Sequence, residues 1–173
     1  MVIDCTEVFT TRPSGLKARQ QLFSNYKCHN TVNFLVGCSM SGSIVYVSQG
    51  WGGRASDKKI TCEGCLDMLA SGEAVMADRG FLVKEEVEAR GCKLHLPAFL
   101  TANRAQLTAA EVMETRRIVR ARIHIERAIQ RIKLFGILKL LPLSLLHVSE
   151  QIFKVCAYLT NFQKPVIADV VDL

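Results

Sequence analysis

Three carboxylates stand in contexts that are unusual for surface acids. Asp4 lies inside an apolar run over residues 2–9, Asp78 ends the apolar run 74–78, and Glu126 lies in a segment crowded with cations. Hard cations such as Mg²⁺ take oxygen ligands, often one or two carboxylates together with water and phosphate oxygens. Two such ions about 4 Å apart can stabilise the attacking and leaving oxygens of phosphoryl chemistry. Three carboxylates from two strands and a helix would suffice to hold them.

Each carboxylate also has a structural interpretation. An acid in a strand, such as Asp4, can face water or cap a neighbouring turn. Glu126 can form an ion pair with Arg122, one helical turn earlier, which is worth only about 0.2–0.5 kcal/mol. Residue chemistry alone leaves both interpretations of each acid open.

The segment around Glu126 is the most unusual stretch of the chain. Between Arg116 and Lys133, Glu126 is the only acid. The cations of this segment are Arg116, Arg117, Arg120, Arg122, Arg127, Arg131 and Lys133. A lone acid among them could ligate a metal beside a DNA backbone that the arginines hold. The alternative is a solvated helix face or a set of intramolecular ion pairs.

Hydrophobic periodicity predicts the elements that must position these residues. Two β-rich runs flank a Ser41-Gly42 turn signal and predict a hairpin. The spacing of Thr108 and Glu111 predicts a capping box at the start of a long helix. The predicted strands are 2–9, 32–37, 43–47, 74–78 and 93–97, and the predicted helices are 57–69, 84–89, one that opens at 107–111, and 149–161.

Three strands followed by alternating helices and strands predict an α/β fold. The pairing is expected to give a mixed central sheet flanked by helices. This order of elements is that of a ribonuclease H-like fold. We expect a single domain over residues 1–173, with a C-terminal helix and tail over 148–173. The first strand begins without a lead-in, which predicts a chain that is truncated at its N-terminus.

Composition narrows the functional class. The chain has 173 residues, of which 49% are hydrophobic, and its net charge of +6 raises the expectation of a polyanionic partner. Its longest apolar stretch, 134–148, is too short and too interrupted to span a bilayer. Seven scattered cysteines without a signal sequence predict reduced thiols in an intracellular protein.

Five ordered blocks resemble the Harbinger-like DDE transposase domain, and they cover about residues 2 to 140. The blocks are residues 3–7 with 12–14, 24–27 with 29–31, 51–54 with 56–58, 77–81, and 122–127. The resemblance implies a ribonuclease H-like fold, a nuclease and strand-transfer activity on DNA, and a location in the nucleus. It also implies a divalent cation, Mg²⁺ or Mn²⁺.

The resemblance places the catalytic, metal-binding acids at Asp4, Asp78 and Glu126. Asp57 is a further acid within a family block, and it is expected either to support the metal from a second layer or to cap the helix beside it. The cations expected to hold DNA phosphates are Lys17, Arg19, Lys27, Arg116, Arg120, Arg122, Arg127 and Arg131. Such contacts are independent of base sequence and weaken with salt.

The sequence shows neither a zinc-finger pattern nor a recognisable helix-turn-helix. We therefore expect a separate DNA-binding protein or domain to recognise specific sites. The alternative function is that of a catalytically inactive, domesticated or decayed transposase-derived domain that binds DNA or protein. The presence of all three acids favours the enzyme.

Overall fold

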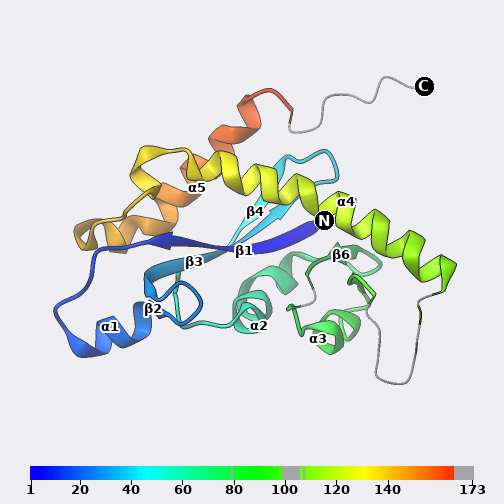
Figure 1. Cartoon of the computed structure of the whole chain (residues 1–173), viewed down its shortest axis with the longest axis horizontal. Coiled ribbons are helices and arrows are strands. Elements are labelled where there is room, and N and C mark those ends of the chain that lie inside the picture. The colour runs from blue at the N-terminus through cyan, green and yellow to red at the C-terminus, as the bar shows by residue number, and fades with distance from the viewer. Residues whose placement is uncertain (79, 99–105, 107, 166–173) are drawn as a thin grey trace.

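The computed structural model describes residues 1–78, 80–98, 106 and 108–165. It confirms the predicted α/β class, with a mixed sheet flanked by helices on both faces (Figure 1). The strands are β1 Val2–Phe9, β2 Phe23–Ser24, β3 His29–Cys38, β4 Ile44–Val47, β5 Trp51–Gly52, β6 Ala74–Met76 and β7 Lys93–His95. The α-helices are α1 Leu16–Leu22, α2 Asp57–Ile60, α3 Lys84–Glu88, α4 Ala109–Lys133 and α5 Ser149–Leu159.

Shorter helical turns complete the chain. They are a π-helical turn, η1 Thr61–Cys65, and the 3₁₀ turns η2 Leu66–Met68, η3 Gly136–Leu138, η4 Leu143–Val148 and η5 Thr160–Phe162. All seven cysteines are free. Within the described part of the chain, no helix is both long and apolar enough to cross a membrane.

The sheet has the strand order β2-β3-β1-β6-β7, and β4 and β5 also pair with β3. β1 and β3 form a long antiparallel ladder from Val2↔Cys38 to Phe9↔Thr31. The parallel ladder between β1 and β6 contains the single register pair Val2↔Met76. Beyond Val2, β1 and β6 therefore diverge, and Asp4 lies where they separate.

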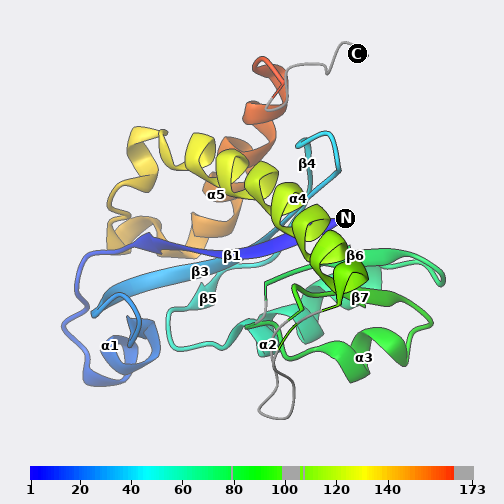
Figure 2. The same ribbon diagram turned by 45° about the vertical axis from the view of Figure 1, so that its right-hand side comes forward.

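One face of the sheet is covered by α4 and α5 (Figure 2). Val2 and Val8 of β1 belong to the apolar core on this face, together with Ile125 of α4 and Phe153 of α5. Because side chains alternate along a strand, Asp4 points toward the same face as Val2 and Val8. The alternation of β1 thus aims a carboxylate at α4.

The opposite face carries a second apolar core. Ile3 of β1, Leu35 of β3 and Val75 of β6 pack there against Ile60 of α2 and Val87 of α3. The short β6 is therefore held between two layers, and its end at Met76 is fixed two residues before Asp78.

The long helix α4 begins with the predicted capping box. The Thr108 hydroxyl accepts a hydrogen bond from the Glu111 amide at 3.3 Å, and the Glu111 carboxylate accepts one from the Thr108 amide at 2.8 Å. These two bonds satisfy amides that the first turn would otherwise leave unpaired. The predicted apolar stripe of Ile118, Ile125, Ile129 and Ile132 is buried. Its burial fixes which side of α4 faces the sheet.

Some elements differ from the sequence expectation. Three short elements were not predicted: α1 and β2, which precede β3, and β5, which precedes α2. The helix predicted over 57–69 is one α-helical turn that continues as η1 and η2. Arg79, Leu107 and residues 166–173 of the predicted tail lie outside the described residues.

Candidate active site

Three separate elements bring the predicted acids to one region. Asp4 is on β1, Asp78 follows the end of the neighbouring strand β6, and Glu126 is on α4, one turn after Arg122. The charges of Asp78 and Glu126 both raise the pKa of Asp4, which shows that all three acids share one electrostatic environment. The structure thus gathers the three residues at one place.

Arg122 links two of these acids. Its Nη1 lies 3.2 Å from Oδ1 of Asp78, and its Nη2 lies 3.4 Å from Oε1 of Glu126. The ion pair between Glu126 and Arg122, which the sequence offered as the structural interpretation, is therefore present. It coexists with the proximity of Glu126 to the other acids.

Asp4 is the most perturbed acid of the site. Burial raises its pKa to about 6, against the lowering effects of the Arg122 charge and of a hydrogen bond from the Cys5 amide. That amide donates to Asp4 Oδ1 at 2.9 Å. Desolvation penalises the charged carboxylate, and the nearby acids add to the penalty. An added cation would therefore be stabilised here.

A cavity of about 890 Å³ opens beside Asp4. Asp4, Asp78 and Arg122 are in its lining, whereas Glu126 reaches the site through Arg122. The full lining is Asp4, Cys5, Thr6, Glu7, Ser24, Asn25, Tyr26, Lys27, Asn33, Gly53, Arg54, Ala55, Ser56, Asp57, Lys58, Asp78, Gly80, Leu82, Arg122 and Lys133. The cavity thus extends from the acids along β1 toward the loop before β3.

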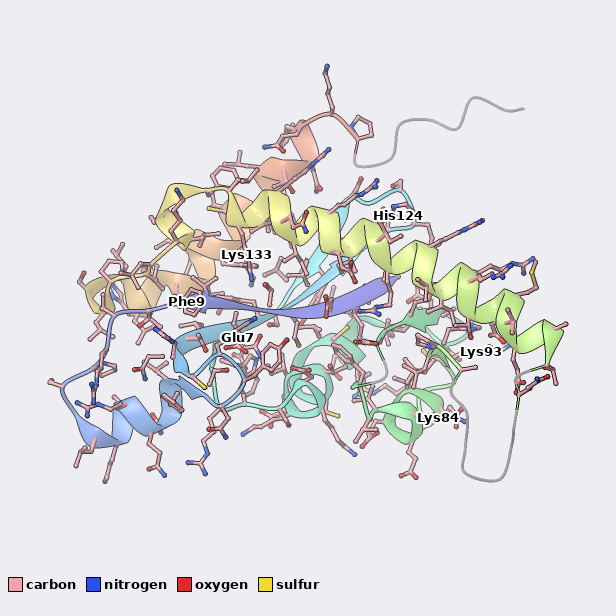
Figure 3. The ribbon with its side chains drawn as sticks, viewed as in Figure 1. Glu7, Phe9, Lys84, Lys93, His124 and Lys133 are labelled. Carbon is pink, nitrogen blue, oxygen red and sulfur yellow. The ribbon has the colours of Figure 1, made fainter. Side chains whose placement is uncertain are left out.

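Four cations of this lining surround the far part of the cavity. They are Lys27, Arg54, Lys58 and Lys133. The pKa of Lys133 is lowered, first by partial burial and then by the charge of Lys27, so these two ammonium groups face a common space. Figure 3 shows Lys133 on the α4 side of β1 and Glu7 on the other side. The cavity therefore has an ammonium group on the α4 side of β1 and a carboxylate on the other side.

Only Lys27 among these four was predicted as a site residue. A signal for Arg54 was present in the preceding Gly52-Gly53 pair. A Cβ at Gly53 would collide with the Thr31 hydroxyl and the Leu22 carbonyl, so glycine lets this loop pack against β3 and turn Arg54 into the cavity. Lys133 had no such signal, because its position depends on where α4 crosses β1.

The floor of the cavity contains polar atoms that the protein leaves unpaired. Among the described residues, Thr6 Oγ1 and Asn33 Oδ1 are buried and find no hydrogen-bond partner. The neighbouring Glu7 carboxylate accepts a hydrogen bond from the Thr31 hydroxyl at 2.6 Å. Thr6 Oγ1 and Asn33 Oδ1 are both closed to solvent, so their unpaired state is a local cost to stability and not a contact offered to a ligand.

Asp57 also lines the cavity, but it is not the helix cap. Ser56 caps α2, since its hydroxyl accepts from the Lys59 amide at 3.3 Å. Asp57 instead contacts the buried Cys5 thiol, whose pKa is raised first by burial and then by the charge of Asp57 and a hydrogen bond to it. Asp57 therefore lies next to the residue that follows Asp4.

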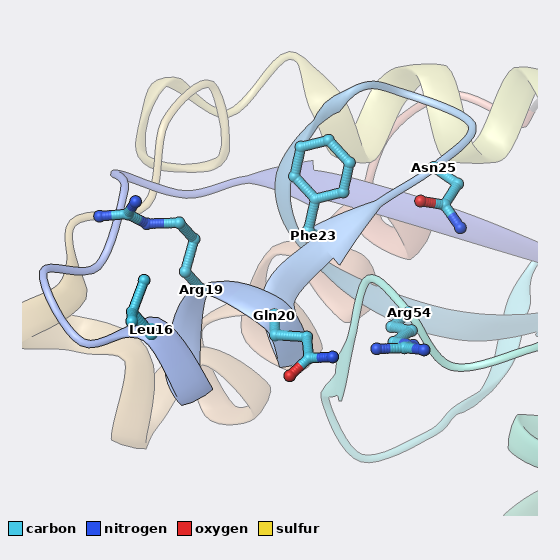
Figure 4. A pocket seen from close by; sticks show the side chains of 6 residues that line it. All are labelled: Leu16, Arg19, Gln20, Phe23, Asn25 and Arg54. Carbon is cyan, nitrogen blue, oxygen red and sulfur yellow. The ribbon is translucent and has the colours of Figure 1, made fainter.

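The structure separates the predicted phosphate-binding cations into groups. Lys27 and Arg122 line the cavity with the acids. Lys17 and Arg19 are on α1, and Arg19 borders a different hollow of about 560 Å³ with Phe23 and Arg54 (Figure 4). The Arg19 guanidinium also donates to the Pro13 carbonyl at 3.2 and 3.3 Å. These α1 cations are thus away from the acids.

The remaining predicted cations form an outer arginine row on α4, made of Arg116, Arg120, Arg127 and Arg131. A second row of the helix, the cavity row, contains Arg122, Glu126 and Lys133. At about 100° per residue, the two rows lie roughly a third of a turn apart. Arg131 donates to the Lys164 and Pro165 carbonyls, so its guanidinium supports the C-terminal segment.

Carboxylate oxygens are the donors that hard divalent cations prefer. Over residues 1–78, 80–98, 106 and 108–165, no group of three or more His, Cys, Asp or Glu side chains is arranged closely enough to hold a metal ion. The chemistry of the donors nevertheless fits, because a cationic guanidinium already bridges two of the acids. The acids attract a cation, and Arg122 supplies one.

The chain was compared with known proteins. It matches the family model described as DDE superfamily endonuclease over residues 3–161, which spans β1 through α5 and includes all three acids. Comparisons with curated proteins and with solved structures gave no match. Because the family match extends over nearly the whole chain, the protein belongs to the DDE superfamily of endonucleases.

Proposed function

We propose that this chain is a divalent-metal-dependent DNA endonuclease and strand transferase with a ribonuclease H-like fold. One observation carries the proposal: Asp4 and Asp78 line a cavity that also has cations in its lining, and Arg122 bridges Asp78 to Glu126. The family match supports a nuclease. We further propose that the enzyme works in the nucleus and depends on a separate DNA-binding protein or domain for site selection.

In this proposal Asp4, Asp78 and Glu126 hold Mg²⁺ or Mn²⁺. The bound metal would supply Lewis-acid activation of a water or a DNA 3′-hydroxyl and stabilisation of the leaving oxygen. The protein contributes fixed positions: Asp4 is anchored by the Cys5 amide at 2.9 Å, and its strand is held in the eight-residue β1–β3 ladder. Asp57, against the Cys5 thiol, supports that position from behind.

The remaining cavity residues would bind the DNA. Lys27 and Lys133 offer point charges to phosphates, and Arg54 offers a planar fork for bidentate contact, whereas Lys58 is already paired with Glu86 at 2.6 Å. Tyr26 is 83% exposed at the same cavity, with the Lys27 ammonium 4.5 Å from its ring centroid, and the ring could stack on an unpaired base if that ammonium turned to a phosphate. These groups position the backbone beside the acids without reading its sequence.

The alternative is a transposase-derived domain that binds DNA or protein without cutting. The specific observation in its favour is that the described residues contain no ready-made group of three metal-binding side chains. The two proposals differ in metal binding, so metal binding is the property to measure.

The deciding experiment is calorimetric titration of the full chain with Mg²⁺ and with Mn²⁺, combined with nicking of supercoiled plasmid. Asp78→Asn keeps the size of the side chain and removes its charge. Glu85→Gln removes an equal charge from an exposed position on α3 and serves as the matched control. We expect wild type and Glu85→Gln to bind metal and nick DNA, and Asp78→Asn to do neither.

Wild-type protein that binds DNA but shows neither a metal-binding signal nor metal-dependent nicking would refute the enzyme and favour the binding domain. Equal metal binding by wild type and Asp78→Asn would refute the residue assignment, because the metal would then lie elsewhere.

A further inference from the structure

Arg122 forms ion pairs with two acids and acts through its charge on a third. Its guanidinium is 3.2 Å from Asp78 and 3.4 Å from Glu126, and its positive charge lowers the pKa of Asp4 against the effect of burial. An arginine remains protonated and presents several donors in one plane, so it can bridge two carboxylates. In the metal-free protein, Arg122 is therefore a counter-ion shared by the proposed metal-binding acids.

The surroundings of Arg122 allow it to leave these acids. Its side chain is 20% exposed and forms part of the cavity lining, whereas the two paired carboxylates are 46% and 50% exposed. Separating a fully buried ion pair would strand an unpaired charge at high cost. A partly exposed guanidinium at the edge of a cavity can instead exchange its carboxylate contacts for water.

We propose that Arg122 is an internal competitor of the divalent cation. Its guanidinium must leave Asp78 and Glu126 before the cation can bind to these two carboxylates. This inference rests on the proposed function, since it takes these carboxylates to be metal ligands. A guanidinium and a divalent cation repel each other at contact distance, and both need the same carboxylate oxygens. The guanidinium and the metal therefore exclude each other from the same carboxylate oxygens.

Competition has a definite thermodynamic sign. An interaction that stabilises the acids only in the metal-free protein weakens the binding of the metal by the same factor, because the two equilibria are linked. Removing the Arg122 charge should thus tighten metal binding and make the metal-free protein less stable. A purely structural Arg122, which holds the carboxylates in their binding positions, predicts the opposite change in metal affinity.

The test is calorimetric titration of the full chain with Mn²⁺ and with Mg²⁺ for wild type, Arg122→Gln and Arg117→Gln. Arg117 is exposed and lies five residues earlier on α4, so its substitution matches the change in net charge. We expect Arg122→Gln to lower the metal Kd by about tenfold, within the usual range of coupling between linked sites. Arg117→Gln should change the Kd by less than about twofold, because salt screens a distant exposed charge.

Thermal unfolding gives a second readout that does not depend on activity. Without metal, Arg122→Gln should melt at a lower temperature than wild type, and added Mn²⁺ should raise its melting temperature by more than it raises that of wild type. If Arg122→Gln does not fold, Arg122→Lys decides the matter. A lysine keeps the charge but lacks the bidentate fork, so its metal affinity should exceed that of wild type.

Two failures are distinguishable. Metal binding that is unchanged or weaker in the Arg122 variant overturns the competition and leaves the metal site standing. Absence of metal binding in wild type and in the Arg122 variant overturns the proposed function itself, and the inference falls with it.

Discussion

The two charged rows of α4 have similar helical spacing and different surroundings. The outer arginine row and the cavity row both follow steps of four and seven residues along the same helix. The cavity row faces β1 and the end of β6, where Arg122 meets Asp78 and Glu126. In the outer row, Arg116, Arg120 and Arg127 are exposed, and Arg131 binds backbone carbonyls.

The difference shows that charge type alone does not assign a role on this helix. An arginine becomes part of the site only where the helix crosses the diverging strands β1 and β6. In the outer row, an exposed cation would act on the proposed DNA only through long-range attraction that salt screens. Substitutions in the cavity row should therefore change metal-dependent nicking, whereas substitutions in the outer row should change the salt dependence of DNA binding.

The largest expected contrast is between two adjacent residues, Glu126 and Arg127. Glu126→Gln should lower the metal-dependent nicking rate by about 10²–10³-fold, the scale at which loss of one preorganised electrostatic group acts. Arg127→Gln should lower it by no more than a few-fold, because its side chain is on the outer row. Initial nicking rates at saturating Mn²⁺ measure both. Similar losses in the two variants would erase the distinction between the rows.

The charged carboxylate of Asp4 should destabilise the folded protein when no metal is bound. Its folded pKa of about 6 exceeds the ordinary value of 3.8, so the folded protein binds more protons than the unfolded chain between these pH values. The contribution of Asp4 to the free energy of unfolding is therefore most favourable below about pH 4, where the carboxyl is protonated in both states. It is lost as the pH rises through 6 and the buried carboxylate becomes charged. Asp4→Asn keeps an oxygen for the Cys5 amide and removes the charge. It should raise the free energy of unfolding at pH 7.5 by roughly 3 kcal/mol.

Urea unfolding in EDTA at pH 4 and pH 7.5 tests this sign. The advantage of Asp4→Asn should be close to zero at the lower pH. Asp67→Asn, at an exposed acid paired with Arg90 at 2.6 Å, is the control and should give no gain. An equal gain at both pH values would show that packing, rather than ionisation, causes the difference in stability between wild type and Asp4→Asn.

The outer row should act through DNA and not through metal. A combined Arg116→Gln, Arg120→Gln and Arg127→Gln variant should reduce the slope of log K against log salt by up to about 2.7, since each lost phosphate contact contributes about 0.9. Its metal Kd should stay at the wild-type value. Fluorescence anisotropy with a labelled duplex at several salt concentrations measures the slope. An unchanged slope would remove these three residues from the DNA interface.

The smallest predicted effect concerns the helix that presents both rows. Thr108→Ala removes the hydroxyl that accepts the Glu111 amide, and it should cost about 1 kcal/mol of stability. Thr108→Ser keeps the hydroxyl and should retain most of the stability. Chemical unfolding monitored by circular dichroism distinguishes them. A loss of equal size in both variants would show that the methyl group, and not the cap, is responsible.

Much of the framework was predictable because the relevant signals are local. The alternation in 2–9, the turn at Ser41-Gly42 and the capping box at Thr108 each involve a few neighbouring residues, and each predicted element is present. α1 was missed because its seven residues bury only Leu22 and its first turn has no side-chain cap. β5 was missed because one of its two residues is a glycine, which carries no strand preference.

The acids of the site were easier to select than its cations. Asp4 and Asp78 stand out against apolar neighbours, which makes them candidates, and the family resemblance selects them. Arg122 and Arg127 are both arginines of one cation-rich helix, and helical spacing separates their rows without saying which row faces the strands. That choice depends on how α4 packs, through the burial of Ile118, Ile125 and Ile132, onto the sheet.

The single register pair between β1 and β6 has a mechanical consequence. Asp4 is carried by the firmly laddered β1–β3 pair, with eight register pairs, while Asp78 is carried by the β6–β7 pair, and Val2↔Met76 is the rung that joins them. Met1 adds two hydrogen bonds at the same end, one to the Ala74 carbonyl and one from the Met76 amide, and Val75 packs with Ile3 in the core below. The spacing between Asp4 and Asp78 therefore depends on Met1, Val2 and that core, and not on pairing along the whole length of β1.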